Sequence, residues 1–188
     1  NGGSTIILAL LLPLGGAVAI ALAGRISANL RETVTLATAG GLAMTVWSLL
    51  PAVMAGERPG VSITELLPGV EIAFSVEPLG MLFAALASGL WIINSLYSIG
   101  YMRGNNERNQ TRFYVMFAVS LAATMGVAFA GNLFTLFLFY EALTLSTYPL
   151  VSHKGDAATV RSARVYLGIL LTTSIGLFLP AIIWTYSV

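Results

Sequence analysis

One carboxyl group lies deep inside an apolar part of the sequence. Glu141 stands nine residues after Asn132 and eleven before Ser152, in a run that is otherwise uncharged. At about 1.5 Å of helical rise per residue, it falls near the middle of a membrane-spanning helix, where an ionised carboxylate costs at least a few kcal/mol. Hydrocarbon favours the protonated form of a carboxyl group, whereas a nearby cation or ordered water favours the ion. We therefore interpret Glu141 as a proton site or cation ligand; the alternative is a permanently protonated group that only bonds a neighbouring helix.

Three further side chains extend this candidate site toward one end of the helix. Thr144 and Tyr148 share the helical face of Glu141, and His153 follows at the mouth of the helix beside Lys154. Hydroxyl groups can hold water or relay a proton, but they also join helices to one another. His153 is a candidate proton collector, and the alternative is a solvated loop histidine. No other residue type that could form a catalytic set accompanies them, so we do not expect a stand-alone enzyme.

A weaker polar group lies in the last apolar segment. Thr172, Thr173 and Ser174 are consecutive hydroxyl residues within it. They are candidates for lining a wet cavity, and the alternative is that they hydrogen-bond to their own helix.

The composition indicates what must position these residues. Of 188 residues, 57% are hydrophobic and only 9% are charged, against about 25% in an ordinary soluble domain. This excludes a cytosolic globular protein, a disordered segment and a basic nucleic-acid binder. With no cysteine and one histidine, we expect no disulfide, no metal site and no cofactor. An all-α, polytopic membrane protein remains.

Six apolar segments are long enough to cross about 30 Å of hydrocarbon, which takes about 20 helical residues. We predict that they are Thr5–Ala23, Thr33–Ala55, Leu79–Met102, Phe113–Ala130, Leu133–Val151 and Arg164–Tyr186. Under this prediction Glu141 is the one formally charged residue inside a span.

The loop charges predict an orientation. Arg58 is alone among the cations on one side of the six predicted spans. By the positive-inside rule the other side is cytoplasmic, so both termini are extracytoplasmic. The predicted cytoplasmic cations are Arg25, Arg31, Arg103, Arg108, Arg112, Lys154, Arg161 and Arg164.

The loop from Glu57 to Pro78 is the one sizeable segment outside the membrane. Residues 70–77 largely alternate between apolar and polar or small side chains, and Pro59-Gly60 and Pro68-Gly69 supply turns. We predict a short hairpin that covers the outer helix ends; the alternative is a surface for a partner. The chain then divides into residues 1–78, with two helices and this loop, and residues 79–188, with helices three to six.

The segment Gly131–Tyr148, GNLFTLFLFYEALTLSTY, resembles the fifth-helix signature of the antiporter-like proton-translocating subunits. This family includes the large membrane-arm subunits of respiratory complex I, subunits A and D of the Mrp cation/proton antiporter, and subunits of membrane-bound hydrogenases. Residues 77–80, EPLG, are similar to the family's third-helix entry. Residues 97–102, YSIGYM, and 112–114, RFY, are similar to its third-helix exit and fourth-helix start.

The resemblance implies that Glu141 helps to set the charge of a partner lysine in a proton path. Family members are longer and carry that lysine on a seventh helix, so we expect an N-terminal part of a subunit or one half of a split subunit. Residues 79–188 would then include the start of the first antiporter-type repeat. Tyr140, where many members have tryptophan, and Pro149 point toward the Mrp D-type branch or the hydrogenase-linked branch.

These observations predict a subunit of a multisubunit proton- or cation-translocating complex, such as an NADH:quinone oxidoreductase-like complex or an antiporter. Its partners would be other membrane subunits, a proton or sodium ion and membrane lipid, without nucleic acid, in a bacterial or archaeal cell membrane. Two alternatives stay open: a membrane subunit that energises uptake of a small inorganic substrate, and a structural anchor for a redox or hydrogenase arm.

Overall fold

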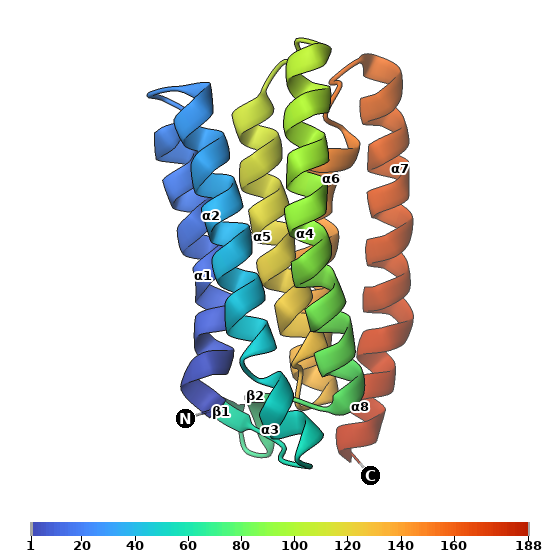
Figure 1. The fold of residues 1–188 in the computed structure, drawn as a ribbon. Coiled ribbons are helices and arrows are strands. Elements are labelled where there is room, and N and C mark those ends of the chain that lie inside the picture. The colour runs from blue at the N-terminus through green and yellow to red at the C-terminus, as the bar shows by residue number, and fades with distance from the viewer. Residues whose placement is uncertain (1, 188) are drawn as a thin grey trace.

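Six apolar segments form long helices that lie side by side in the computed structural model, which describes residues 2–187 (Figure 1). Their length and hydropathy are those of membrane spans, which confirms the predicted all-α, six-span fold of an integral membrane protein. The spans are Gly2–Ala23, Ala28–Met54, Pro78–Gly104, Gln110–Ala128, Leu133–Val151 and Ala157–Ser187.

Two of the spans consist of more than one element. The second combines two helices, and the sixth contains a π-helix between two α-helices. In chain order the elements are α1 (Gly2–Ala23), α2 (Ala28–Trp47), α3 (Leu50–Met54), β1 (Gly60–Leu67), β2 (Val70–Ser75), α4 (Pro78–Gly104), α5 (Gln110–Ala128), α6 (Leu133–Val151), α7 (Ala157–Thr173), the π-helix η1 (Ser174–Phe178) and α8 (Leu179–Ser187).

Polar caps start two helices earlier than the hydrophobic pattern predicted. The Ser27 hydroxyl accepts a hydrogen bond from the Leu30 amide at 3.1 Å, so α2 begins at Ala28 rather than Thr33. The Asp156 carboxylate accepts one from the Thr159 amide at 3.0 Å, so α7 begins at Ala157 rather than Arg164. Such caps satisfy amides of the first helical turn, which lets a helix extend beyond the apolar run.

The predicted hairpin is confirmed, and it packs at one end of the bundle (Figure 1). β1 and β2 pair antiparallel, and Gly69 at the turn has a φ of 82°, a conformation that favours glycine. The hairpin also bonds to the loop between α5 and α6: the Ser75 amide donates to the Phe129 carbonyl and the Gly131 amide to the Ala73 carbonyl, both at 2.8 Å. The hairpin therefore fixes the start of α6.

The core lies among α1, α2, α4 and α5. Ile6, Ile20, Leu42, Trp91 and Met125 are almost completely buried there. The sixth span contributes little to this core, because most of its apolar side chains are exposed along α7, η1 and α8.

The two described ends of the chain lie at the same end of the bundle as the hairpin (Figure 1). The six spans therefore agree with termini on one side of a membrane. Which side is cytoplasmic stays a prediction from the charges, as does the division into residues 1–78 and 79–188.

Candidate functional site

Glu141 lies near the middle of α6, as predicted. Its helix is fixed at the start by Asn132, whose side-chain oxygen accepts a hydrogen bond from the Thr135 amide at 2.7 Å and whose side-chain nitrogen donates to the Glu71 carbonyl of β2 at 2.8 Å. The Glu141 side chain is half-buried, and its Oε1 is buried without a hydrogen-bond partner among residues 2–187. Buried polar atoms normally have partners, so this oxygen calls for a proton, an ion, water or another polar group.

Thr144 and Tyr148 follow Glu141 on the same face of α6, but hydrogen bonds do not connect the three side chains within residues 2–187. Thr144 is buried, and its hydroxyl donates to the Tyr140 carbonyl one turn earlier at 3.1 Å. Tyr148 is half-buried. The described part of the chain thus places the predicted polar residues in one line without joining them.

His153 lies directly after α6 and packs edge-on against Phe113, with ring centroids 5.6 Å apart. Both ring nitrogens are buried without a partner in the described residues. Burial, and secondarily the positive charge of Arg112, lowers the pKa of His153. The imidazole is therefore neutral at pH 7 and accepts a proton less readily than a solvated histidine. It lies roughly 18 Å from Glu141 along the helix axis.

The π-helix lies beside the same part of α6. Tyr140, which precedes Glu141, packs against Phe178 with ring centroids 6.4 Å apart, and both border a cavity of about 380 Å³. Thr173 and Ser174 line this cavity, while their hydroxyls donate to carbonyls of their own helix. The second interpretation is confirmed for Thr173 and Ser174, which bond to their own helix; Thr172 does not line the cavity, and a wet cavity stays a prediction. A π-turn within an α-helix is frequent at functional sites, and nothing in the sequence pattern predicted this one.

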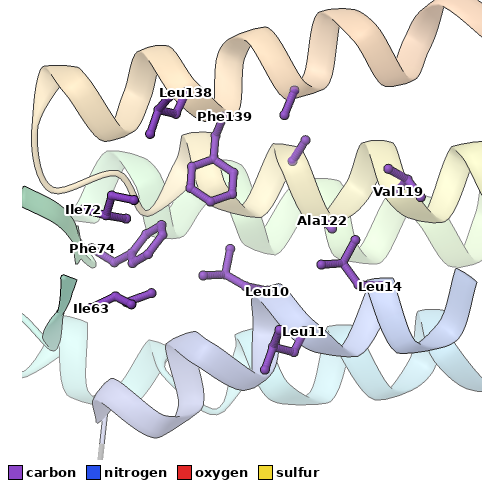
Figure 2. A pocket seen from close by; sticks show the side chains of 12 residues that line it. Leu10, Leu11, Leu14, Ile63, Ile72, Phe74, Val119, Ala122, Leu138 and Phe139 are labelled. Carbon is purple, nitrogen blue, oxygen red and sulfur yellow. The ribbon is translucent and has the colours of Figure 1, made fainter. Parts of the chain in front are cut away.

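A second cavity, of about 430 Å³, lies on another side of α6 and is lined only by aliphatic and aromatic side chains (Figure 2). Phe74 of β2 and Phe139 of α6 point into it, and their ring centroids are 5.4 Å apart. Leu10, Leu11 and Leu14 of α1 form its opposite wall (Figure 2). This cavity offers no polar group to an ion, so any polar path past Glu141 runs elsewhere.

Glu141 is not the one charged residue inside a span, which corrects the prediction. Because α2 begins at Ala28, Arg31 and Glu32 lie in its first turns, and both are buried. Glu32 accepts hydrogen bonds from Arg31 at 3.1 Å and from Arg103 of α4 at 3.0 and 2.5 Å. These three residues, the end cluster, join α2 to α4. Ser27, as a capping residue upstream of Arg31 and Glu32, was the signal that could have predicted their place in a helix.

Arg31 also connects the end cluster to α5. Its guanidinium donates to the Gln110 side chain at 3.0 Å and to the Thr111 hydroxyl at 3.3 Å. It also lies 5.1 Å from the centre of the Tyr114 ring, in a cation–π arrangement. The end cluster is therefore a well-bonded junction of three helices, unlike the surroundings of Glu141.

The fold is that of a polytopic membrane protein, and Glu141 is an ionisable group in the middle of one of its six candidate spans. Over 159 residues, 84% of its length, the chain is 28% identical to NADH-quinone oxidoreductase subunit N from Desulforudis audaxviator. Over 98 residues, 52% of its length, it is 33% identical to Na(+)/H(+) antiporter subunit A1 from Staphylococcus aureus. It spans 32% and 12% of these two relatives, respectively. No family model matches the chain.

Two solved structures match the chain over most of its length. The membrane-bound sulfane sulfur reductase, an archaeal respiratory membrane complex, matches 91% of the chain with a TM-score of 0.75 at 17% identity, which supports the fold. The Mrp complex from Dietzia sp. DQ12-45-1b matches 91% with a TM-score of 0.71 at 26% identity. The chain covers 34% and 19% of these structures. Its homologues are antiporter-like membrane subunits, which confirms the resemblance; they include both complex I and Mrp proteins and so do not separate the branches.

Proposed function

We propose that this chain is part of a membrane subunit in a multisubunit complex that moves protons or other cations. Two relatives are named as subunits of an NADH-quinone oxidoreductase and of a Na(+)/H(+) antiporter, and one solved neighbour is an Mrp complex. None of these three is described as an uptake system for an inorganic substrate, so they do not favour that alternative. Other membrane subunits are the partners this proposal requires.

Within that complex, the proposal assigns proton or cation exchange to Glu141. The observation that carries it is the buried Oε1 without a hydrogen-bond partner in the described residues, in the middle of a span. A purely structural carboxyl group would be expected to bond a neighbouring helix, because an unmet polar group in hydrocarbon costs free energy. An exchangeable proton or a transient cation accounts for retaining such a group.

Thr144, Tyr148 and His153 are proposed as secondary members of the path. Unit charges about 6–10 Å apart interact by a few kcal/mol at an effective dielectric constant of about 20. A charge change on a neighbouring helix at that distance is therefore large enough to control proton occupancy at Glu141. The neutral His153 would pass protons at the end of α6 rather than store positive charge.

The test is Glu141→Gln in the assembled complex, with proton and sodium flux measured in sealed vesicles. Glutamine keeps the size of the side chain but cannot ionise, so we expect flux to fall at least about tenfold. Glu57→Gln, which neutralises an exposed carboxylate near the hairpin, is the matched control and should leave flux unchanged.

If ion flux in Glu141→Gln equals flux in the control, Glu141 is not part of the path. That result would favour the alternative of a structural anchor for a redox or hydrogenase arm.

Infrared difference spectra give an independent readout. A carboxyl band that changes between acidic and alkaline pH and disappears in Glu141→Gln supports exchange. A band that stays protonated throughout contradicts it.

A further inference from the structure

The apolar cavity of about 430 Å³ between α1, α5, α6 and the hairpin has no part in the function proposed above. It extends along the helices (Figure 2). Ile72 and Phe74 of the hairpin lie at one end, and Leu14 and Val119 lie toward the other. The cavity therefore begins at the hairpin and continues into the bundle between membrane-spanning helices.

The cavity reaches about half the depth of the membrane. Val119 is the middle residue of α5, and Ala142, which also lines the cavity, follows Glu141 near the middle of α6. Nine residues, or about 14 Å of helix, lead from Val119 to Ala128 at the hairpin end of α5. One leaflet contributes about half of the roughly 30 Å of hydrocarbon. The cavity therefore has the depth of a single leaflet.

The cavity has a buried floor and an exposed rim. Leu10, Ala122 and Ala123 are buried at the floor, where the two alanines leave room that larger side chains would fill. Leu11 and Leu14 line the same cavity and are 56% and 42% exposed. Because both leucines belong to the span α1, the cavity opens toward the surroundings of the bundle at hydrocarbon depth.

The lining excludes water as a stable occupant. A buried water molecule needs about two to four polar partners, and all twelve described lining side chains are aliphatic or aromatic. An empty cavity would forfeit dispersion contacts along its walls. Since an apolar cavity of about 150 Å³ takes up one benzene molecule, this one has room for roughly 17 carbon atoms. That is comparable to one acyl chain of a phospholipid.

A protein partner fits the cavity less well than an acyl chain does. A helix with its side chains is about 10 Å across, so 14 Å of helix would occupy roughly 1,100 Å³. This is more than twice the volume of the cavity, about 430 Å³. A stable interface between proteins also takes about 20–30 residues a side, whereas twelve described residues line this cavity. The occupant is therefore a narrow apolar chain.

The charge at the hairpin end selects among lipid headgroups. The segment from Glu57 to Glu77 holds four carboxylates and one cation, Arg58, so its net charge is −3. Glu65 and Glu71 are cross-strand partners in the hairpin, and both are exposed. Like charges repel an anionic headgroup, whereas the ammonium group of a zwitterionic lipid is attracted.

We propose that this cavity binds one acyl chain of a zwitterionic phospholipid. The headgroup would lie at the hairpin, and the methyl end of the chain would lie near Val119 and Ala142. The chain would complete the packing among α1, α5 and α6. The proposal does not depend on ion exchange at Glu141, because it rests on apolar packing and on the charge of the hairpin.

The test uses the assembled complex in lipid nanodiscs. Phosphatidylethanolamine that carries a photoactivatable diazirine in one acyl chain is cross-linked to the protein, and the labelled residues are identified by peptide mass spectrometry. A diazirine at the methyl end should label Val119, Leu138 and Ala142. A diazirine near the glycerol should label Ile63 and Ile72 instead, because they line the hairpin end of the cavity.

Ala142→Phe should lower the labelling of Val119 at least about fivefold, because the added ring fills the cavity. Ala37→Phe makes the same substitution on an exposed face of α2 and is the control, which should label as the wild type does. Leu14→Trp narrows the exposed rim and should also lower labelling, so the test remains decisive if Ala142→Phe does not assemble. The same probe built on phosphatidylglycerol should label about threefold less, the effect of exposed charges.

Equal labelling in Ala142→Phe, or in Leu14→Trp if that variant is needed, and in Ala37→Phe would overturn the proposal. Labelling of the cavity no stronger than that of Leu82 and Leu86, on the exposed face of α4, would also overturn it, since that result means surrounding lipid only. Cross-links from the cavity to another polypeptide in place of lipid would contradict it as well. Equal labelling by the two headgroups would overturn the assignment to a zwitterionic lipid.

Discussion

The end cluster and the surroundings of Glu141 differ in whether a buried carboxyl group has bonding partners. In the end cluster, Glu32 is bonded by both Arg31 and Arg103, and Arg31 reaches a third helix through Gln110. At Glu141, a carboxylate oxygen is buried without a partner among residues 2–187. Buried charges that are paired with an opposite charge hold helices together, whereas a buried carboxyl group without a counter-charge or hydrogen bond fits the exchange role proposed above. On the proposed function, this difference separates a structural role in the end cluster from an exchange role at Glu141.

The largest expected effect is on the end cluster. Glu32→Gln leaves Arg31 buried without its counter-charge, so we expect the free energy of unfolding to fall by roughly 3 kcal/mol. Thermal and denaturant unfolding in detergent would measure it. Glu107→Gln, which is nearby but outside the cluster's hydrogen bonds, is the control and should change stability little. If Glu32→Gln were as stable as this control, the end cluster would not stabilise the bundle as stated here.

A smaller effect on stability is expected at Glu141. Because its buried carboxylate oxygen has no hydrogen-bond partner in the described structure, Glu141→Gln should change the free energy of unfolding by less than about 1 kcal/mol while flux is lost. The same unfolding measurement, made beside the flux assay, gives the answer. A loss of stability as large as that of Glu32→Gln would mean that Glu141 is a structural bond like the end cluster.

The smallest effect is a pH dependence at His153. Burial lowers its pKa below that of the unfolded chain, so the unfolded state binds more protons as the pH falls through about 6.5. Stability from this residue is thus present at pH 8 and decreases as the pH falls toward 5.5. Melting temperatures of the wild type and His153→Gln should run parallel with pH near pH 8 and differ in their acid slopes, because loss of the ring contact with Phe113 does not depend on pH. Identical slopes would contradict a lowered pKa.

The sequence predicted the spans well because the length of an uninterrupted apolar run can be read without knowing how the helices pack. Leu133–Val151 was predicted with the bounds that the structure shows, and the hairpin followed from alternation and turn residues. The helix starts at Ala28 and Ala157 were missed, because a capping hydrogen bond extends a helix beyond its apolar run. Glu32 was missed for the same reason, since it falls just outside the apolar pattern while lying inside the helix.

The candidate site was predictable in position but not in surroundings. Glu141 stands out because it is a carboxyl group in an apolar run, which spacing alone reveals. That its Oε1 lacks a partner in the described residues, and that Thr144 bonds back to Tyr140, depend on three-dimensional packing. The π-helix Ser174–Phe178 has no residue signature of its own, because one extra residue per turn is decided by contacts with neighbouring helices.

The hairpin has a mechanical consequence for any conformational step near Glu141. Sliding α6 along its axis would break the bonds from Asn132 to the Glu71 carbonyl and from the Ala73 amide to the Thr135 hydroxyl. The last span makes no comparable polar attachment to the hairpin in the described residues, and most of its apolar surface is free of the bundle. If the proposed exchange at Glu141 takes place, we expect α6 to stay stationary and the sixth span to be the element whose tilt or rotation changes the environment of the carboxyl group.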